Sequence, residues 1–460
     1  MHLSYGLSAS LLFHTPKHLR DSIQGKVKIM AQKNSRDIPL LGKITPKPRR
    51  LDRLAKQILF NRLANLKHGT LSIVENINNI KTEVKFGSSR PDSLLEDIQV
   101  VLEVKNTQFY GEVVFGGSIG AGEAYMQGYF ECDNLTNLIR LMVRSQSLLD
   151  SIETGLARLT SPIQKWLHTI NRNTQEGSRR NIAAHYDLGN DFFELMLDPT
   201  MMYSSAIFEH PKQSLEDASI AKLKSICEKL DLKETDHLLE IGTGWGGFAI
   251  YAVQNYGCKV TTTTISQQQY LMAIERVKQA GLEDRIEILV TDYRDLNGTY
   301  DKLVSIEMIE AIGYQFYDTY FAKCSRLLKP NGMMLLQAIT IVDQRYESAI
   351  KSVDFIQRYI FPGSCIPSVT AMLESITQSS DLRLFDLQDI GPHYAKTLAM
   401  WRDNFFKNIA QIRAMGYPET FIRMWDFYLC YCEGGFEERA LGDVHMLLVK
   451  PDNRRAPIGG

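Results

Sequence analysis

The sequence predicts a doubly wound α/β domain in the C-terminal part of the chain and a small α+β domain before it. The chain has 460 residues, which is too long for one ordinary domain of about 100–200 residues. From about residue 214 onward, short apolar strands alternate with helical patterns. This alternation is typical of a parallel sheet with helices on both faces. Strand-like runs before residue 146 lie closer together, which favours a separate α+β unit.

The composition is that of a globular protein, but its charge is unevenly distributed. Hydrophobic residues make up 44% and charged residues 23%, which excludes a mainly disordered or collagen-like chain. The formal net charge of -1 gives no support to a nucleic-acid partner. Residues 1–68 contain 14 Lys and Arg but only 3 Asp, so this segment carries +11 and the remainder carries -12. The basic segment is either a solvated tail or a contact for an anionic surface.

Cysteine usage and hydropathy indicate a cytoplasmic protein that does not span a membrane. The seven cysteines include no C-x-x-C pair, and scattered free thiols suit a reducing compartment. Cys430 and Cys432 lack the spacing of metal ligands, and we expect no metal site. The apolar stretches are shorter than the ~18 residues that a membrane helix needs. Residues 7–13 lack the flanks of a signal peptide, so we expect any membrane contact to be peripheral.

The N-terminal part is expected to contain an arm, a small domain and a linker. Their predicted bounds are 1–50 for a mobile basic arm, 51–145 for the α+β domain and 146–180 for a helical linker, followed by the domain of residues 181–460. Leu54, Ile58 and Leu63 recur at helical spacing, which predicts an amphipathic helix from Leu51. The further elements expected here are strands at 70–74, 81–86 and 98–104, a glycine-rich turn at 116–122 and a helix at 133–142 capped by Asn134 or Asp133.

The C-terminal domain shows the strand and helix patterns in regular succession. The strands are expected at 237–241, 259–265, 285–290, 302–306 and 333–340, and the helices at 214–230, 248–256, 267–280 and 317–328. Ser214 and Asp217 form a capping signal at the start of the first helix.

A glycine-rich turn with the sequence EIGTGWGG, at residues 240–247, joins the first strand of this domain to the next helix. Gly242 and Gly244 allow a sharp turn there and let a ligand approach with no Cβ in the way. Many doubly wound proteins need such a turn simply to fold, so the turn alone is weak evidence for a ligand site.

Residues near this turn favour S-adenosylmethionine over a dinucleotide. A dinucleotide site needs an acid at the end of the second strand, where this chain has Thr264 and then three glutamines that include Gln269. Glu240 precedes the glycines, where a carboxylate can meet the cationic end of a ligand. Asp292 and Tyr293 follow a strand at the edge where open α/β sheets bind ligands, and they suit an amino group and a purine ring.

Several motifs between residues 180 and 450 resemble those of the cyclopropane-fatty-acyl-phospholipid synthases. They are NIAAHYDLGNDFF at 181–193, LDP at 197–199, MYSSA at 202–206, the turn after Glu240, and SIEMIEAIG at 305–313. The resemblance implies a Rossmann-like S-adenosylmethionine methyltransferase whose helical insertions roof a lipid pocket. We add Tyr203 and Ser204 to the expected cofactor contacts. The small N-terminal domain is also similar to that of the larger bacterial members, though less distinctively.

The resemblance also implies a bound bicarbonate ion, which the family holds with a cysteine, a glutamate, a histidine, a tyrosine and a backbone group. In this sequence Glu310 matches the glutamate, Tyr394 the tyrosine and Ile339 the backbone contact. Ser205 stands in place of the cysteine, and Gln337 in place of the histidine. Both substitutes can form hydrogen bonds, but Gln337 carries no charge and would hold an anion less strongly.

The implied reaction is the transfer of a methylene group from S-adenosylmethionine to the double bond of an unsaturated phospholipid acyl chain, which forms a cyclopropane ring. The substitutions at Ser205 and Gln337 keep open methyl transfer without ring closure, to a methyl-branched lipid or an N-methylated small molecule. A non-catalytic lipid-binding protein is a further alternative, against which the intact Glu240, Asp292 and Glu310 argue. Glu307 is either functional or the structural partner of an arginine. The oligomeric state, a homodimer included, is left open.

Overall fold

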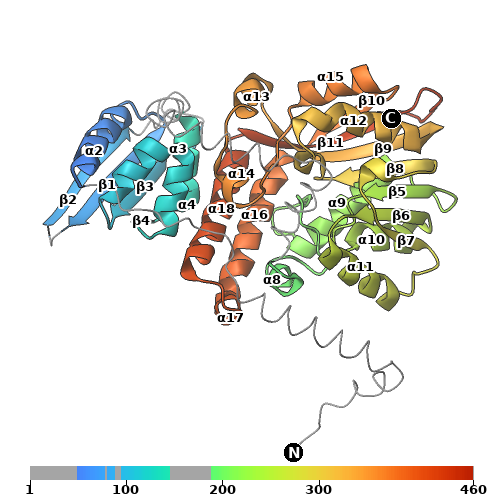
Figure 1. The fold of residues 1–460 in the computed structure, drawn as a ribbon, viewed down its shortest axis with the longest axis horizontal. Helices are drawn as coiled ribbons and strands as arrows, with labels where there is room; N and C mark the ends of the chain where they lie inside the picture. The colour runs from blue at the N-terminus through green and yellow to red at the C-terminus, as the bar shows by residue number, and fades with distance from the viewer. Residues whose placement is uncertain (1–48, 78–79, 89–94, 146–187, 459–460) are drawn as a thin grey trace, which may run out of the picture. The chain divides into compact units, whose positions relative to one another are not determined.

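The computed structural model describes residues 49–77, 80–88, 95–145 and 188–458. The expected basic arm, apart from its last two residues, and the expected linker at 146–180 therefore lie outside the described residues. All of the described residues belong to one compact unit. Within this unit, two β-sheets carry helices on their faces (Figure 1).

Four of the described strands form the small sheet, in the order β2-β1-β3-β4. These strands are β1 (Gly69–Ile77), β2 (Ile80–Ser88), β3 (Ile98–Val104) and β4 (Phe130–Cys132). Strand β1 pairs antiparallel with β2 and parallel with β3, while β4 pairs antiparallel with β3. The three strands expected from the sequence in this part of the chain are confirmed.

The first described helix, α2 (Arg49–Leu63), confirms the helix expected from Leu51, but with a different buried face. Its buried apolar residues are Ala55, Leu59 and Leu63, whereas Leu54 is 52% exposed. The helix therefore turns a narrower apolar face toward its neighbour α3 (Gln108–Met126) than the leucine spacing predicted.

The prediction of a glycine-rich turn at residues 116–122 is wrong, because these residues lie inside α3. The helix is kinked at Gly117, whose backbone has φ 59° and ψ -139°. The kink brings the backbone at Gly120 close to Glu112, so that a Cβ at Gly120 would lie 2.0 Å from the Glu112 carbonyl oxygen. A Cβ at Gly122 would meet the ring of Phe355 at 2.4 Å. The glycines thus permit close tertiary packing of a helix.

Helix α4 (Leu135–Arg144) packs beside the small sheet and confirms the predicted cap. The small sheet with α2, α3 and α4 is called the small domain below. The Asn134 side chain accepts a hydrogen bond from the backbone N–H of Asn137 at 2.8 Å.

Seven of the described strands form the large sheet, in the order β10-β11-β9-β8-β5-β6-β7. Their bounds are β5 (His237–Ile241), β6 (Lys259–Thr264), β7 (Ile286–Val290), β8 (Tyr300–Ile306), β9 (Leu328–Ile341), β10 (Arg383–Asp389) and β11 (Leu441–Val449). Strands β5 to β9 pair in parallel, as the alternation of strands and helices predicted. Strand β11 runs antiparallel to both of its neighbours, so the sheet is mixed rather than purely parallel.

Alternate residues of the large sheet face two separate hydrophobic layers. Leu239 and Leu336 belong to the layer that α12 and α15 cover, while their neighbours Leu238 and Leu335 belong to the layer under α9, α10 and α11. These helices are α9 (Leu215–Lys229), α10 (Gly247–Tyr256), α11 (Gln267–Gln279), α12 (Tyr317–Leu327) and α15 (Val369–Ser379). The doubly wound architecture is therefore confirmed.

Further helices lie outside the regular alternation, as the family resemblance predicted. They are α8 (Asn190–Glu194), α13 (Asp343–Ala349), α14 (Phe355–Tyr359), α16 (Gly391–Lys407), α17 (Ile409–Ala414) and α18 (Glu419–Glu437). Most of them interrupt the chain between β9 and β11. In the part of the chain that the structure describes, no helix combines the length and hydropathy that a membrane crossing requires.

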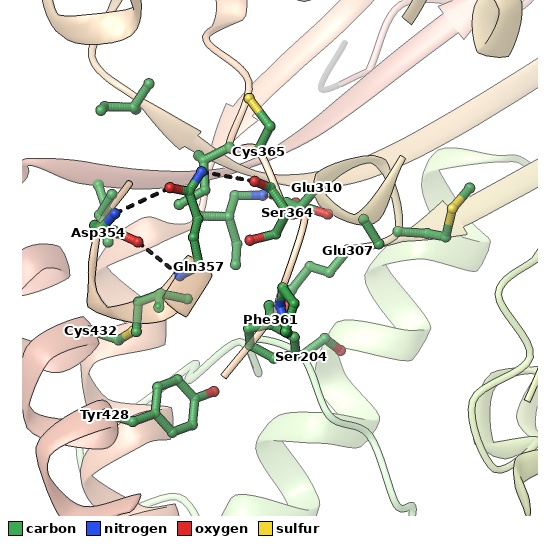
Figure 2. A pocket seen from close by; sticks show the side chains of 18 of the residues that line it. Ser204, Glu307, Glu310, Asp354, Gln357, Phe361, Ser364, Cys365, Tyr428 and Cys432 are labelled. Carbon is green, nitrogen blue, oxygen red and sulfur yellow. Dashed lines mark hydrogen bonds between the residues drawn. The ribbon is translucent and has the colours of Figure 1, made fainter. Parts of the chain in front are cut away.

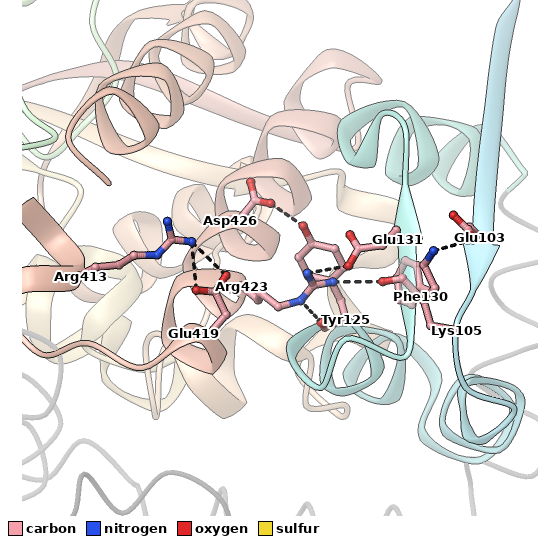
Figure 3. Close-up of polar contacts among 9 residues, drawn as sticks. All are labelled: Glu103, Lys105, Tyr125, Phe130, Glu131, Arg413, Glu419, Arg423 and Asp426. Atoms are coloured by element: carbon pink, nitrogen blue, oxygen red, sulfur yellow. Dashed lines mark hydrogen bonds and ion pairs between the residues drawn. The ribbon is translucent and has the colours of Figure 1, made fainter. Parts of the chain in front are cut away.

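The small domain packs on α18 through buried polar contacts as well as apolar ones (Figure 3). The Tyr125 hydroxyl of α3 donates to Asp426 at 2.6 Å, and Arg423 donates to the carbonyl oxygens of Tyr125 and Phe130. The Arg423 guanidinium also lies 4.0 Å from the centre of the Tyr125 ring. One arginine of α18 therefore fixes the end of α3 and the start of β4 together.

The packing at the kink of α3 predicts opposite outcomes for two glycine substitutions in the same helix. Gly120→Ala places a methyl group against the Glu112 carbonyl, and we expect a loss of about 1–3 kcal/mol in the free energy of unfolding. Gly116→Ala is the matched control, because nothing lies within 4 Å of its added Cβ. Thermal unfolding followed by circular dichroism measures both, and equal midpoints for the two variants would contradict the close approach at Gly120.

Candidate active site

A cavity of about 1120 Å³ opens at the carboxyl ends of the parallel strands. This edge is where open α/β sheets bind their ligands. Its lining includes the glycine turn after β5, the end of β6, and the loops after β7 and β8. The insertion helices α13, α14, α16 and α18 also contribute lining residues. Figure 2 shows Gln357 of α14 and Tyr428 and Cys432 of α18 among them.

The glycine turn has the conformation that its sequence predicted. Gly242, Gly244 and Gly246 have φ values of 104°, 51° and 83°, which side chains rarely tolerate. A Cβ at Gly244 would meet no atom within 4 Å, so the backbone borders open space there. A Cβ at Gly247 would lie 2.3 Å from the Thr200 carbonyl oxygen, so this glycine serves packing instead.

Glu240, at the end of β5, is 2% exposed and lines the cavity. One of its carboxylate oxygens accepts a hydrogen bond from Thr262 at 2.6 Å, and Thr262 in turn bonds Thr243 of the turn. Burial raises the pKa of Glu240 to about 8, against the opposing effects of Thr262 and Lys222. A cationic ligand would stabilise the charged form of this buried carboxyl. The sequence predicted this role for Glu240.

The other predicted cofactor residues also line the same cavity. They are Tyr203, Ser204, Gly242, Gly244, Thr264, Gln269, Asp292 and Tyr293. The Thr264 hydroxyl donates to Gln269 at 2.9 Å, which joins the end of β6 to the start of α11. Asp292 binds the Arg294 guanidinium with both of its oxygens, at 2.8 and 2.7 Å. The chemistry of the turn and of Glu240 fits S-adenosylmethionine, because an open glycine backbone and a buried carboxylate suit a cationic ligand.

Glu310 and Ile339, which the resemblance assigned to a bicarbonate ion, bond each other in the structure. Glu310 lies in a short 3-10 helix, Ile309–Ala311, after β8 and is 8% exposed. One of its oxygens accepts a hydrogen bond from the Ile339 backbone N–H at 2.5 Å, and the other, Oε2, is buried with no partner among the described residues. Burial, followed by the charge of Glu307, raises the pKa of Glu310 to about 8.

Ser205, Gln337 and Tyr394 are brought together, but on a residue that the sequence did not assign. All three donate to the carboxylate of Glu307: the Ser205 backbone N–H at 2.9 Å, the Gln337 amide at 2.8 Å and the Tyr394 hydroxyl at 2.6 Å. Ser205 and Gln337 are completely buried and do not line the cavity, whereas Glu307, Glu310 and Tyr394 do. Glu307 is thus not the partner of an arginine in this part of the chain.

The residues present do not fit the bicarbonate ion that the resemblance implied. The Ser205 backbone N–H, Gln337 and Tyr394 are already bonded to Glu307, and the Ser205 hydroxyl donates to the Ala206 carbonyl at 3.0 Å. An added anion at these donors would have to displace a buried carboxylate. The sequence signal for Glu307 was its place in the SIEMIEAIG motif, but the motif does not reveal which of its two glutamates faces the donors.

Three further buried residues support this arrangement. The side-chain oxygen of Gln337, Oε1, pairs with His445 Nε2 at 3.2 Å. This contact orients the side-chain NH2 group of Gln337 toward Glu307 and Asp443. Lys222 of α9, which is wholly buried, donates to the Ser204 hydroxyl at 2.8 Å. Sequence patterns gave no signal for Lys222, Asp443 or His445, because each side chain reaches the site only through tertiary packing.

Beyond these acids the cavity is apolar and reaches the small domain. Its lining there consists of Ile119 of α3, Ile139, Met142 and Val143 of α4, and Phe427, Tyr428 and Tyr431 of α18. Trp401 of α16 and Trp425 of α18 lie instead in the protein interior. The aromatic residues thus divide between packing and cavity, a division that composition alone does not reveal.

Comparison with known proteins shows what the chain is similar to. Residues 173–446 match the family model described as mycolic acid cyclopropane synthetase. The chain is 40% identical to the cyclopropane-fatty-acyl-phospholipid synthase of Escherichia coli K12, over 74% of this chain and 85% of that protein. It is 37% identical to the tuberculostearic acid methyltransferase UfaA1 of Mycobacterium tuberculosis, over 73% of this chain and 79% of that protein.

The chain belongs to the cyclopropane synthase family. The solved structure of the mycolic acid cyclopropane synthase CmaA1 with SAH and CTAB superimposes with a TM-score of 0.56 at 31% identity, over 59% of this chain and 98% of that one. The chain is therefore an S-adenosylmethionine-dependent methyltransferase with a Rossmann-like fold, as its motifs predicted. Within the described ranges, no cluster of three His, Cys, Asp or Glu residues is arranged to hold a metal ion.

The raised pKa of Glu240 predicts how cofactor binding depends on pH. A cationic ligand binds the ionised carboxylate, so the affinity for S-adenosylmethionine should fall below pH 8, by up to about tenfold per pH unit. Glu240→Gln keeps the hydrogen bond with Thr262 but removes the charge, so its affinity should be lower and independent of pH in this range. Titration calorimetry between about pH 6 and about pH 9, a range that brackets the pKa of about 8, tests both proteins. The same slope in Glu240→Gln would assign the dependence to another group.

Proposed function

We propose that the protein transfers the methyl carbon of S-adenosylmethionine to the double bond of an unsaturated phospholipid acyl chain. The observation that carries this proposal is that one cavity contains the cofactor residues, two buried glutamates and a long apolar region. Its volume of about 1120 Å³ exceeds the ~300–1,000 Å³ usual for a small-ligand pocket. Space of this size suits a cofactor together with an acyl chain.

S-adenosylmethionine supplies an electrophilic methyl group on a sulfonium ion. An alkene is a weak nucleophile, so the protein must hold it close to that methyl group and exclude water. The apolar residues of α4 and α18 suit the acyl tail, and the buried glutamates lie where charge and protons change during the reaction. Loss of a proton after methyl transfer requires a base within hydrogen-bond reach of the reacting carbons.

The leading product is a cyclopropane fatty acyl chain, formed when the new methyl group loses the proton. The 40% identity to the Escherichia coli cyclopropane-fatty-acyl-phospholipid synthase supports this product. The second candidate is a methyl-branched chain, formed when a neighbouring carbon loses the proton instead. Two observations favour it: the 37% identity to a tuberculostearic acid methyltransferase, and the carboxylate of Glu307 on donors that the resemblance assigned to bicarbonate.

Lipid analysis of cells that produce the protein tests the function. With methyl-labelled methionine, we expect labelled phospholipid acyl chains that are heavier by one carbon. Fragmentation of the labelled chains separates a ring from a branch, because the two place the added carbon differently relative to chain cleavage. Cells producing Gly244→Trp, which fills open space at the glycine turn, serve as the control. Absence of label from all lipids would contradict the proposed function.

We further propose that the basic N-terminal arm holds the protein peripherally at the anionic inner face of the membrane. Residues 1–50 contain 10 Lys and Arg and 2 Asp, and their net charge of +8 supports this placement, since each basic residue near an anionic bilayer contributes about 1 kcal/mol. A peripheral position gives the cavity access to acyl chains.

Deleting residues 1–48 should weaken binding to vesicles that contain phosphatidylglycerol, and it leaves α2 intact. Raising the salt concentration should weaken binding of the full chain in the same way, because salt screens surface charge. Co-sedimentation with vesicles measures both effects, and phosphatidylcholine vesicles are the uncharged control. Equal binding of the two proteins to anionic vesicles would show the arm to be a solvated tail.

A further inference from the structure

Glu307 occupies a strained backbone position directly after β8. Its φ of 48° lies in the left-handed region, which costs a residue with a Cβ about 1–2 kcal/mol. Its backbone N–H donates to the Gln337 carbonyl oxygen at 2.8 Å, which fixes this conformation. A half-buried, strained acid that borders a cavity indicates a functional requirement, because backbone conformation alone would favour glycine here.

The carboxylate of Glu307 is held in one orientation. Among the described residues, Ser205 and Gln337 donate to its Oε1 and Tyr394 donates to its Oε2. These donors come from the loop before α9, from β9 and from α16. Hydrogen bonds of this kind stabilise the charged form of a carboxyl. Oε2 accepts a hydrogen bond from Tyr394 and has a second lone pair, and the Asp443 carboxyl also bonds Glu307, which borders the cavity.

The surrounding charges assign the negative charge of the cluster to Glu307. Burial raises the pKa of Glu307, but Tyr394, Ser205 and Lys222 oppose this rise. Glu310 has one backbone donor from another strand and faces the charge of Glu307, and its pKa is raised to about 8. Burial and the charge of Glu307 hold the pKa of Asp443 well above its ordinary value. Glu307 therefore has more hydrogen-bond donors that favour its charged form than Glu310 has.

The other titratable groups around the cluster agree with this assignment. Burial lowers the pKa of Lys222 to about 8, and the carboxylates around it favour its charged form. Burial holds the pKa of His445 well below its ordinary value, so this ring is neutral. Burial also holds the pKa of Tyr394 well above its ordinary value, so it remains a hydrogen-bond donor.

We infer that Glu307 is the proton acceptor of the reaction and that its carboxylate takes the place of a separately bound anion. This inference rests on the proposed function. The alkene π electrons form the new carbon–carbon bond to the methyl group, and the carbon–sulfur bond breaks with its electron pair left on sulfur. The resulting carbocation loses a proton, whose C–H electrons form either the ring bond or a new double bond. Glu307 Oε2 receives that proton and becomes a neutral carboxylic acid.

Two substitutions at Glu307 test this role. Glu307→Gln is nearly isosteric but cannot accept the proton, so turnover should fall by about 10²–10⁴-fold. Glu307→Gly removes the carboxylate and suits the left-handed backbone, so it should fold at least as stably as the wild type. It also leaves a space lined by the same donors, which a small oxyanion can enter. Glu347→Gln is the matched control, because the Glu347 side chain of α13 is exposed and does not line the cavity.

In carbonate-free buffer, we expect low turnover from Glu307→Gly. Adding formate or bicarbonate should raise this turnover by at least about tenfold, because the added anion restores part of the ~10²–10⁴-fold that a positioned base contributes. Glu307→Gln should not recover, because its amide fills the space. Full turnover of Glu307→Gly without an anion, or wild-type turnover of Glu307→Gln, would overturn the inference. Thermal unfolding and S-adenosylhomocysteine binding should match the wild type in both variants, which separates catalysis from misfolding.

A binding measurement tests the anion site without any lipid. ¹³C-labelled formate should bind Glu307→Gly, and its NMR signal should shift and broaden, whereas the wild type and Glu307→Gln should leave it unchanged. Equal binding to the wild type would show that Glu307 does not occupy the anion position. A wild type that methylates no lipid would refute the proposed function while leaving this binding result intact.

Discussion

The hydrogen bonds to the buried carboxylate of Glu307 join parts of the chain that lie far apart in the sequence. They connect the loop after β8 with the segment at Ser205, with β9 through Gln337 and with α16 through Tyr394. Asp443 of β11 belongs to the same network through the Gln337 amide. The mixed order of the large sheet makes this convergence possible, since β11 returns antiparallel beside β9 and carries Asp443 and His445 to the site.

Burying several acids together is costly, because each loses hydration and repels the others. The fold offsets part of this cost with one buried ammonium group, on Lys222, and with oriented donors at Glu307. The remaining cost falls on Glu240 and Glu310, whose pKa values are both raised to about 8. A cationic cofactor favours the charged form of these carboxyls, so cofactor binding and the ionisation of the site are physically coupled. The cavity therefore favours a ligand with a positive charge at one end and an apolar substrate at the other.

The small domain contributes directly to the cavity as well as to stability. Its α3 and α4 supply apolar lining, and the contacts of Tyr125 and Arg423 attach it to α18. The absent side chain at Gly120 permits the kink, in which the backbone approaches Glu112 of the same helix, and the absent side chain at Gly122 lets α3 approach Phe355 of α14 and Phe427 of α18. Residues 116–122, which the sequence predicted to form a turn, thus shape one wall of the cavity.

Local sequence patterns were enough to predict the alternation of strands and helices, the glycine turn and the edge of the large sheet that borders the cavity. These features follow from local rules, namely periodicity, capping and the conformational freedom of glycine, so the residues from Glu240 to Tyr293 were found without the structure. Family motifs also located Glu310, Ile339, Ser205, Gln337 and Tyr394. Tertiary structure alone decided that the last three converge on Glu307, and that Lys222, Asp443 and His445 support it. These contacts depend on the crossing of distant strands and on burial, and neither is visible in the local order of residues.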